Sequence, residues 1–328
     1  MLKGFTTPLT DEKGAPMQTV FSQQRIEAWR PLFTPTIVII ILFTSGILLS
    51  GLGVLFYFIS KNIVEVDYRY DDYCAEHYPN STTCILPIEI TKEMTGTVYI
   101  LYRLTNFYQN HQRYVSSRCD AQLRGEYVDY DGMSYCGDFR SHNGSEEKED
   151  WILPCGAIAT SLFNDTFDFY VNNASYFQSI GISWRSDREK LFKKLSTEYN
   201  GTGDLWLDRW NESFPRGQRD EHFIIWMRTA ALPSFMKTYG RNVESDIKPG
   251  MYNITIENNY PTSLFNGEKH VVLSTVSSLG GKNDALGLSY LIVGGLLFFF
   301  GIVVLVSQVF FPRKLGDVSY INIASAAT

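Results

Sequence analysis

The segment from Thr36 to Ser60 contains no charged residue, and this feature constrains the fold most strongly. At about 1.5 Å of helical rise per residue, a run of this length crosses a hydrocarbon core of roughly 30 Å with some tilt. A helix in a globular core rarely lacks a polar face over such a length. We therefore predict a transmembrane helix at residues 36–60. Because residues 1–35 are polar and contain no hydrophobic h-region, we expect an uncleaved anchor rather than a signal peptide.

A second uncharged segment, residues 286–311, predicts a second transmembrane helix. Positively charged residues orient such helices, because they stay on the cytosolic side. Lysines and arginines occur in the first tail and at the start of the last one, whereas acidic residues dominate just after the first span. We therefore expect cytosolic tails at residues 1–35 and 312–328. Residues 61–285 are expected to lie in the lumen or outside the cell.

Cysteines and glycosylation signals are confined to the segment between the two spans. All five cysteines lie there, and neither tail contains an N-glycosylation sequon. Disulfides and N-glycans form on the lumenal side of secretory membranes, so this distribution supports the same topology. The predicted glycan acceptors are Asn80, Asn143, Asn164, Asn173, Asn200, Asn211 and Asn253.

The middle segment has the pattern of a β-rich domain. The chain contains 20 tyrosines and 22 phenylalanines, which favour strands over a helical bundle. Residues 96–104 alternate between apolar and other side chains and give the clearest strand. Weaker patterns predict strands at 63–70, 221–229, 250–257 and 269–276, a helix at 190–198 and a surface loop at 120–150. The expected fold class is an α+β membrane protein, in which two transmembrane helices flank an antiparallel, sandwich-like, glycosylated exoplasmic domain.

Five cysteines allow at most two internal disulfides and leave one thiol. The entropy of loop closure favours short loops, so Cys74 and Cys84 are the expected first pair. Cys136 can then pair with Cys155 or with Cys119. The spacing alone does not choose between these two partners.

The sequence offers little support for an active site. The five histidines are far apart, and no zinc, nucleophile-elbow or Walker motif occurs. Asp129 and Asp131 form the D-x-D pattern of metal-dependent glycosyltransferases, but they lie in a polar stretch beside a turn signal. The spans contain no charged group that could hold an ion or substrate. No long basic run indicates nucleic-acid binding. We therefore expect neither catalysis nor a cofactor.

Small residues recur at helical spacing in both predicted spans. Such stripes allow another helix to approach closely, although glycine is common in membrane helices in any case. The stripes can face each other or a helix of a second protein. They consist of Gly46, Ser50 and Gly53 in the first span, and Gly287, Gly294 and Gly301 in the second.

Five blocks stand out along the chain. They are Gln24–Pro35, with Arg25 and the Ala28-Trp29-Arg30-Pro31 motif, then Tyr102–Val115, Pro154–Asp165, Trp226–Gly240 and Gly280–Gly287. In this order they resemble the cell-division-control-protein-50 / ligand-effect-modulator family, the accessory (beta) subunits of type IV P-type ATPases, which are phospholipid flippases. The resemblance covers most of the chain.

The resemblance implies a one-to-one complex with a ten-span ATPase, which needs this subunit for export from the endoplasmic reticulum and for moving lipids to the cytosolic leaflet. It also implies a Cys136–Cys155 disulfide and a free Cys119. The expected compartments are the endoplasmic reticulum, the Golgi apparatus or endosomes, and the plasma membrane. The residues expected to contact the ATPase are Arg25, Trp29, Arg30, Pro31, Gly46, Ser50, Gly53, Asn106, Phe107, Tyr108, Asn110, His111, Gly287, Gly294 and Gly301.

Alternatives stay open at this point. The segment from Arg25 to Pro31 can anchor the chain at the membrane surface instead of docking on the ATPase. The block from Asn106 to His111 can belong to the domain core. The alternative functions are a membrane-anchored glycosyltransferase-like enzyme that uses Asp129 and Asp131, and a free-standing receptor or adhesion domain.

Overall fold

A computed structural model describes residues 33–171, 174–201, 203–207, 213–242 and 246–312 of the chain. The chain divides into two compact units. One unit comprises Met1–Val54 and Leu288–Thr328, and its described part is a pair of helices. The other unit, Leu55–Gly287, contains all eight described strands.

Two long helices correspond to the uncharged segments of the sequence. Helix α1 spans Pro35–Lys61 and helix α7 spans Asp284–Phe310, so both are long and apolar enough to cross a membrane. Each begins at a capping side chain. Thr34 Oγ1 accepts from the backbone N–H of Ile37 at 3.4 Å, and Asn283 Oδ1 accepts from that of Leu286 at 3.0 Å. The helix bounds lie within two residues of the sequence predictions.

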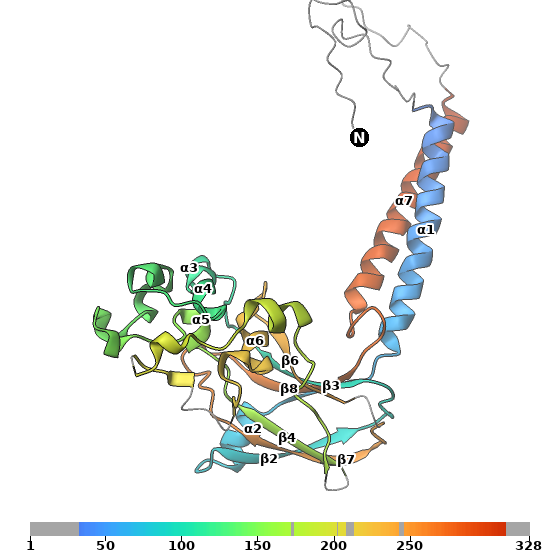
Figure 1. The fold of residues 1–328 in the computed structure, drawn as a ribbon. Coiled ribbons are helices and arrows are strands. Elements are labelled where there is room, and N and C mark those ends of the chain that lie inside the picture. The colour runs from blue at the N-terminus through green and yellow to red at the C-terminus, as the bar shows by residue number, and fades with distance from the viewer. Residues whose placement is uncertain (1–32, 172–173, 202, 208–212, 243–245, 313–328) are drawn as a thin grey trace, which may run out of the picture. The chain divides into compact units, whose positions relative to one another are not determined.

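The strands form two antiparallel four-stranded sheets, which Figure 1 shows one above the other. This arrangement confirms the predicted sandwich-like fold. The first sheet has the order β1 (Glu65–Arg69), β8 (Lys269–Thr275), β3 (Val98–Leu104) and β6 (Phe235–Asn242). The second has the order β2 (Thr83–Ile90), β7 (Gly250–Glu257), β4 (Thr166–Val171) and β5 (Ala174–Ser175).

The main core lies between the sheets. In β2 and β3 every second residue is buried, as expected for strands with one face against a core. Aromatic rings fill the centre. The Tyr102 ring stacks on that of Phe163 with centroids 3.9 Å apart, and Trp226 is fully buried. Aromatic side chains bury large apolar areas, so these rings contribute strongly to stability.

Short helices complete the domain, and Figure 1 places α3, α4 and α5 to one side of the sheets. The α-helices are α2 (Asp71–His77), α3 (Gln112–Ser116), α4 (Asp120–Leu123), α5 (Ala157–Thr160) and α6 (Glu221–Met227). The 3₁₀-helices are η1 (Asp131–Phe139), η2 (His142–Gly144), η3 (Lys148–Asp150), η5 (Thr197–Tyr199) and η7 (Gly217–Arg219). The segment η4 (Asp187–Leu191) is a short π-helix.

Three local predictions were wrong. Residues 120–150 are not a simple surface loop, because Met133 and Cys136 are fully buried in a second apolar cluster. Residues 221–229 form helix α6 instead of a strand. Its N-cap Asp220 accepts from the N–H of His222, and burial of most of the helix removes the polar face that marks a helical period. The helix expected at 190–198 is replaced by the separate turns η4 and η5.

Candidate partner-binding surfaces

The glycine stripes of α1 and α7 face each other. A Cβ atom added to Gly294 would lie 2.3 Å from Ser50 Oγ, and one added to Gly46 would lie 2.9 Å from a ring carbon of Phe298. Gly301 approaches the ring of Phe43 in the same way. The structure therefore assigns these small residues to the contact between the two helices of this chain. This is one of the two arrangements that the sequence left open, the other being contact with a second protein. Gly53 is buried as well.

Polar groups join the two helices where they enter the β-rich unit. The Ser60 hydroxyl donates to Asp284 at 2.6 Å and accepts from the backbone N–H of Asn283 at 3.0 Å. Lys61 forms an ion pair with Asp284 at 2.9 Å. One turn further along α7, a Cβ atom on Gly287 would lie 2.6 Å from the backbone nitrogen of Tyr57. This part of the structure thus requires glycine at position 287.

The block from Asn106 to His111 is divided between core and surface. Phe107 packs its ring against those of Trp226 and Phe265, and the neighbouring Gln109 is fully buried. Asn106 adopts a left-handed backbone conformation with φ of 58°, and its side-chain amide donates to the carbonyl of Phe265. The amide of Asn110 donates to the Ala231 carbonyl at 2.9 Å. Asn106, Phe107 and Asn110 therefore hold neighbouring segments together.

Between these anchors, Tyr108 points outward with 57 % of its surface exposed. Leu232 and Leu264 are 68 % and 85 % exposed on the two segments that the block holds. The N–H of Phe107 donates to the carbonyl of Pro233 at 3.0 Å, which holds the segment with Leu232 against the block. We call Tyr108, Leu232 and Leu264 the Tyr108 patch. Sequence reasoning missed both leucines, because an isolated leucine in a loop has no pattern that reports its exposure.

A groove of about 650 Å³ opens beside helix α3. His111, exposed at the N-cap of α3, lies on its rim together with the exposed rings of Tyr135 and Phe139. On its inner side the hydroxyls of Tyr114 and Ser161 are 2.7 Å apart. Burial raises the pKa of Tyr114 to about 12, so its hydroxyl keeps its proton at neutral pH. The groove therefore presents aromatic and hydroxyl groups together with the charged side chains of Arg113 and Asp138.

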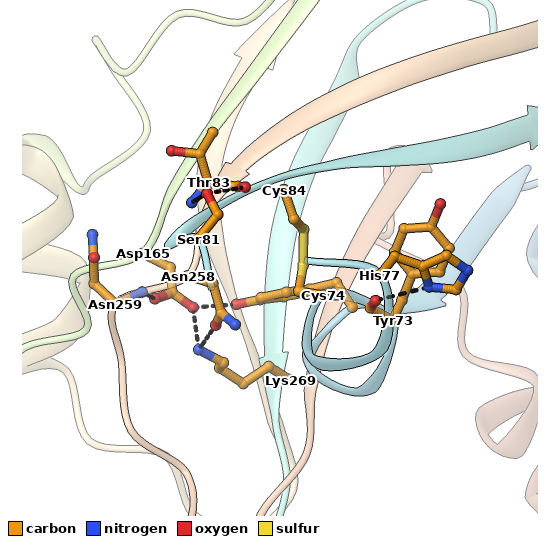
Figure 2. Close-up of a disulfide and its surroundings, with 11 residues drawn as sticks. Tyr73, Cys74, His77, Ser81, Thr83, Cys84, Asp165, Asn258, Asn259 and Lys269 are labelled. Carbon is orange, nitrogen blue, oxygen red and sulfur yellow. Dashed lines mark hydrogen bonds and ion pairs between the residues drawn. A yellow bond between two sulfur atoms is a disulfide. The ribbon is translucent and has the colours of Figure 1, made fainter. Parts of the chain in front are cut away.

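A buried ion pair connects the two sheets close to a disulfide (Figure 2). Lys269 at the start of β8 donates to Asp165 at 2.7 Å, and the two side chains are 3 % and 0 % exposed. Asp165 also accepts from the hydroxyl of Tyr70 and from the N–H groups of Asn259 and Tyr260. Burial lowers the pKa of Lys269, while Asp165 opposes that shift. These hydrogen bonds replace the water that both charged groups lose on burial, so the ion pair is stable inside the domain.

The disulfides lie in the two apolar clusters. Cys74, on α2, is bonded to Cys84 at the start of β2, and Cys136 is bonded to Cys155. Cys119 has a free, buried thiol in the same cluster as the second disulfide. These are the pairs expected from the short loop and from the family resemblance.

The predicted glycan acceptors differ in exposure. Asn80, Asn143, Asn200 and Asn253 are exposed, whereas Asn164 is half-buried. Several other predictions lie outside the described residues, namely the sequons at Asn173 and Asn211 and the docking residues Arg25, Trp29, Arg30 and Pro31.

The acidic D-x-D sequence has a local structural role. Asp129 Oδ1 accepts from the N–H of Gly132 at 2.9 Å, which closes a turn before η1. Its neighbour Tyr130 is buried against Trp151. In the described part of the chain, no three histidine, cysteine, aspartate or glutamate side chains form a group that could hold a metal ion.

The sequence is similar to one protein family over most of its length. Residues 56–314 match the model of the LEM3 (ligand-effect modulator 3) family / CDC50 family. ALA-interacting subunit 3 of Arabidopsis thaliana is 40 % identical, over 94 % of this chain and 90 % of that protein. Cell cycle control protein 50A of Bos taurus is 38 % identical, over 89 % and 88 %. Phospholipid-transporting ATPase accessory subunit CRF1 of Saccharomyces cerevisiae is 34 % identical, over 95 % and 90 %.

Proposed function

The chain belongs to the CDC50/LEM3 family, and from this premise we propose that it is the non-catalytic accessory subunit of a phospholipid-transporting type IV P-type ATPase. It is an integral membrane protein with two membrane helices. The observation that carries the function is similarity over nearly the whole chain to a relative named as an accessory subunit of such an ATPase. The catalytic subunit of that ATPase is the partner.

The Tyr108 patch is the best-supported contact for the exoplasmic loops of the ATPase. Exposed apolar side chains gathered on one surface are typical of interfaces, and tyrosine is frequent among the residues that contribute most to binding. The Asn106, Phe107 and Asn110 anchors hold the patch against the core, so little conformational entropy is lost on binding. His111, the last residue of the block, lines the groove beside α3.

The topology supports this assignment. We infer that both tails are cytosolic and that residues 61–285 carry N-glycans on the exoplasmic side, because the lysine and arginine distribution and the sequons agree. In this arrangement the segment from Arg25 to Pro31 docks on the cytosolic side of the ATPase. The outward apolar faces of α1 and α7 pack on its membrane helices. Joint assembly then permits export of both proteins from the endoplasmic reticulum to later membranes.

Co-expression with candidate type IV ATPases tests the proposal. We expect the tagged full-length chain to retain one ATPase and to acquire endoglycosidase-H-resistant glycans only with that partner. Loss of a central interface residue costs more than about 1–2 kcal/mol, so Tyr108→Ala should lower the retained ATPase roughly tenfold. Tyr170→Ala is the matched control, because Tyr170 is 54 % exposed on β4 and outside the patch. A chain that matures alone and retains no ATPase contradicts the proposed function.

A further inference from the structure

A pocket of about 310 Å³ lies at the ends of the two membrane helices, within the β-rich unit. Its apolar lining consists of Phe56 and Ile59 on α1, Leu286 on α7, and Ile63 and Leu279. Its polar lining consists of Ser60 on α1 and, in the turn that precedes α7, Ser277, Lys282 and Asn283. The pocket therefore combines apolar and polar lining residues.

The helix sequences place this pocket at the boundary of the membrane. Lys61 and Asp284 are the first charged residues at these helix ends, and charged groups remain at the level of the lipid headgroups. Phe56 precedes Lys61 by about 7–8 Å of helix at 1.5 Å per residue. Its ring thus lies at the depth where the acyl chains begin, whereas the turn with Lys282 lies among headgroups.

Lys282 supplies a positive charge that interacts electrostatically with the carboxylates of Glu65 and Asp284 without an ion pair to either. Its side chain is exposed and forms no ion pair in the described part of the chain, whereas the neighbouring Lys61 is paired with Asp284. The turn beside it has a fixed shape, because Ser277 and Gly280 exchange two backbone hydrogen bonds. A lysine ammonium in such a position is a suitable point-charge ligand for phosphate.

We propose that this pocket binds a glycerophospholipid of the exoplasmic leaflet. The phosphate contacts Lys282, and the upper acyl chain lies against Phe56, Ile59 and Leu286. An apolar partner helix would match only the apolar lining and would give the lysine no anionic partner. A phospholipid matches the lysine through its phosphate and the apolar residues through its acyl chain. The accessory subunit then holds a lipid with its own residues, which is a role beyond assembly with the ATPase.

Photolabelling of the full-length chain tests this site in its native assembly. Membranes are converted directly into lipid nanodiscs containing phosphatidylcholine with a diazirine near the start of one acyl chain. After illumination, peptide mass spectrometry should find label concentrated in residues 56–63 and 277–286. Removing one lysine contact near a membrane surface costs about 1 kcal/mol, so Lys282→Gln should reduce this label roughly fivefold. Lys92→Gln, at an exposed lysine between β2 and β3, should leave it unchanged.

A second probe separates a phospholipid site from general contact with the bilayer. Diacylglycerol with the same diazirine lacks the phosphate and should label these peptides much less. Equal labelling by both probes would overturn the proposal, as would label spread evenly over exposed residues such as Ile47 and Leu296. Absence of label at the pocket in the assembled complex would show that protein covers it, and would also overturn the proposal. No ATPase activity enters these readouts, so they are independent of the proposed function.

Discussion

At the scale of single residues, the most consequential contacts join positions that are far apart in the sequence. Asp165 and Lys269 are 104 positions apart, and no local pattern indicates that they meet. The sequence did identify the block from Asn106 to His111, but it could not separate its buried members from Tyr108. That separation depends on which neighbouring carbonyls the side chains reach, and those carbonyls belong to distant loops.

Replacement of Asp165 should destabilise the domain strongly. Asp165→Asn leaves the Lys269 ammonium buried without a counter-charge, and breaking such a pair costs about 3–5 kcal/mol. Chemical unfolding of the purified full-length chain measures this loss. Asp168→Asn, at an exposed position on the adjacent strand, is the control and should have little effect. Equal stability of the two variants would mean that the ion pair does not hold the sheets.

Lys237 should make stability depend on pH. Its ammonium donates to the carbonyls of Ile225, Trp226 and Arg228 at the end of α6, and burial lowers its pKa from 10.5 to about 7. Between these values the unfolded chain binds more protons, so the free energy of unfolding should rise with pH from about 7 to 9. Lys237→Met should flatten this slope, whereas Lys92→Met should retain it. An identical slope in Lys237→Met would contradict the assignment.

At the scale of elements, the sequence located the two long apolar helices and several of the strands. The two membrane helices and the strands β3, β7 and β8 were predicted close to their observed bounds. Helix α6 was mistaken for a strand because most of its side chains are buried, which leaves no polar face. Strands β2, β4 and β6 were missed, although every second residue of β2 is buried. Their partners lie in distant parts of the chain, so no local pattern shows the pairing.

The contact between α1 and α7 should not tolerate a larger side chain. Gly294→Leu places new atoms against the backbone of Ser50 and Gly46, and overpacking of this kind costs about 1–3 kcal/mol. The thermal midpoint of the full-length chain in detergent should fall by several degrees. Gly295→Leu is the matched control, because nothing lies within 4 Å of a Cβ at that position. If Gly295→Leu lowered the thermal midpoint more than Gly294→Leu, the two helices would contact each other through another face.

The Cys136–Cys155 disulfide should stabilise the second apolar cluster. Cys155→Ser removes the bridge and should cost about 2–5 kcal/mol in unfolding free energy. Cys119→Ser removes only the free thiol and should leave both bridges intact. Peptide mapping under non-reducing conditions gives the pairing directly. A Cys119–Cys136 peptide from the native chain would refute it.

At the scale of the whole molecule, the chain combines membrane helices, a disulfide-bonded β domain and exposed apolar surfaces. Helices α1 and α7 pack against each other through their glycines. Their outward faces stay exposed and are available to lipid or to a partner. The β domain presents the Tyr108 patch on a rigid base. Sequence similarity to the CDC50/LEM3 family explains why such a chain works as a subunit, and family membership is the part of the function that sequence alone could reach.

ATP-dependent lipid transport by the purified assembly tests the central claim most directly. The tagged chain is purified with its retained ATPase and reconstituted into proteoliposomes that contain a fluorescent phospholipid. We predict ATP-dependent movement of the lipid toward the leaflet that corresponds to the cytosol. This movement should be lost with an ATPase that lacks its phosphorylated aspartate, and it should be weak when the ATPase is prepared without this chain. Full transport by the ATPase alone, or none by the assembly, would contradict the account.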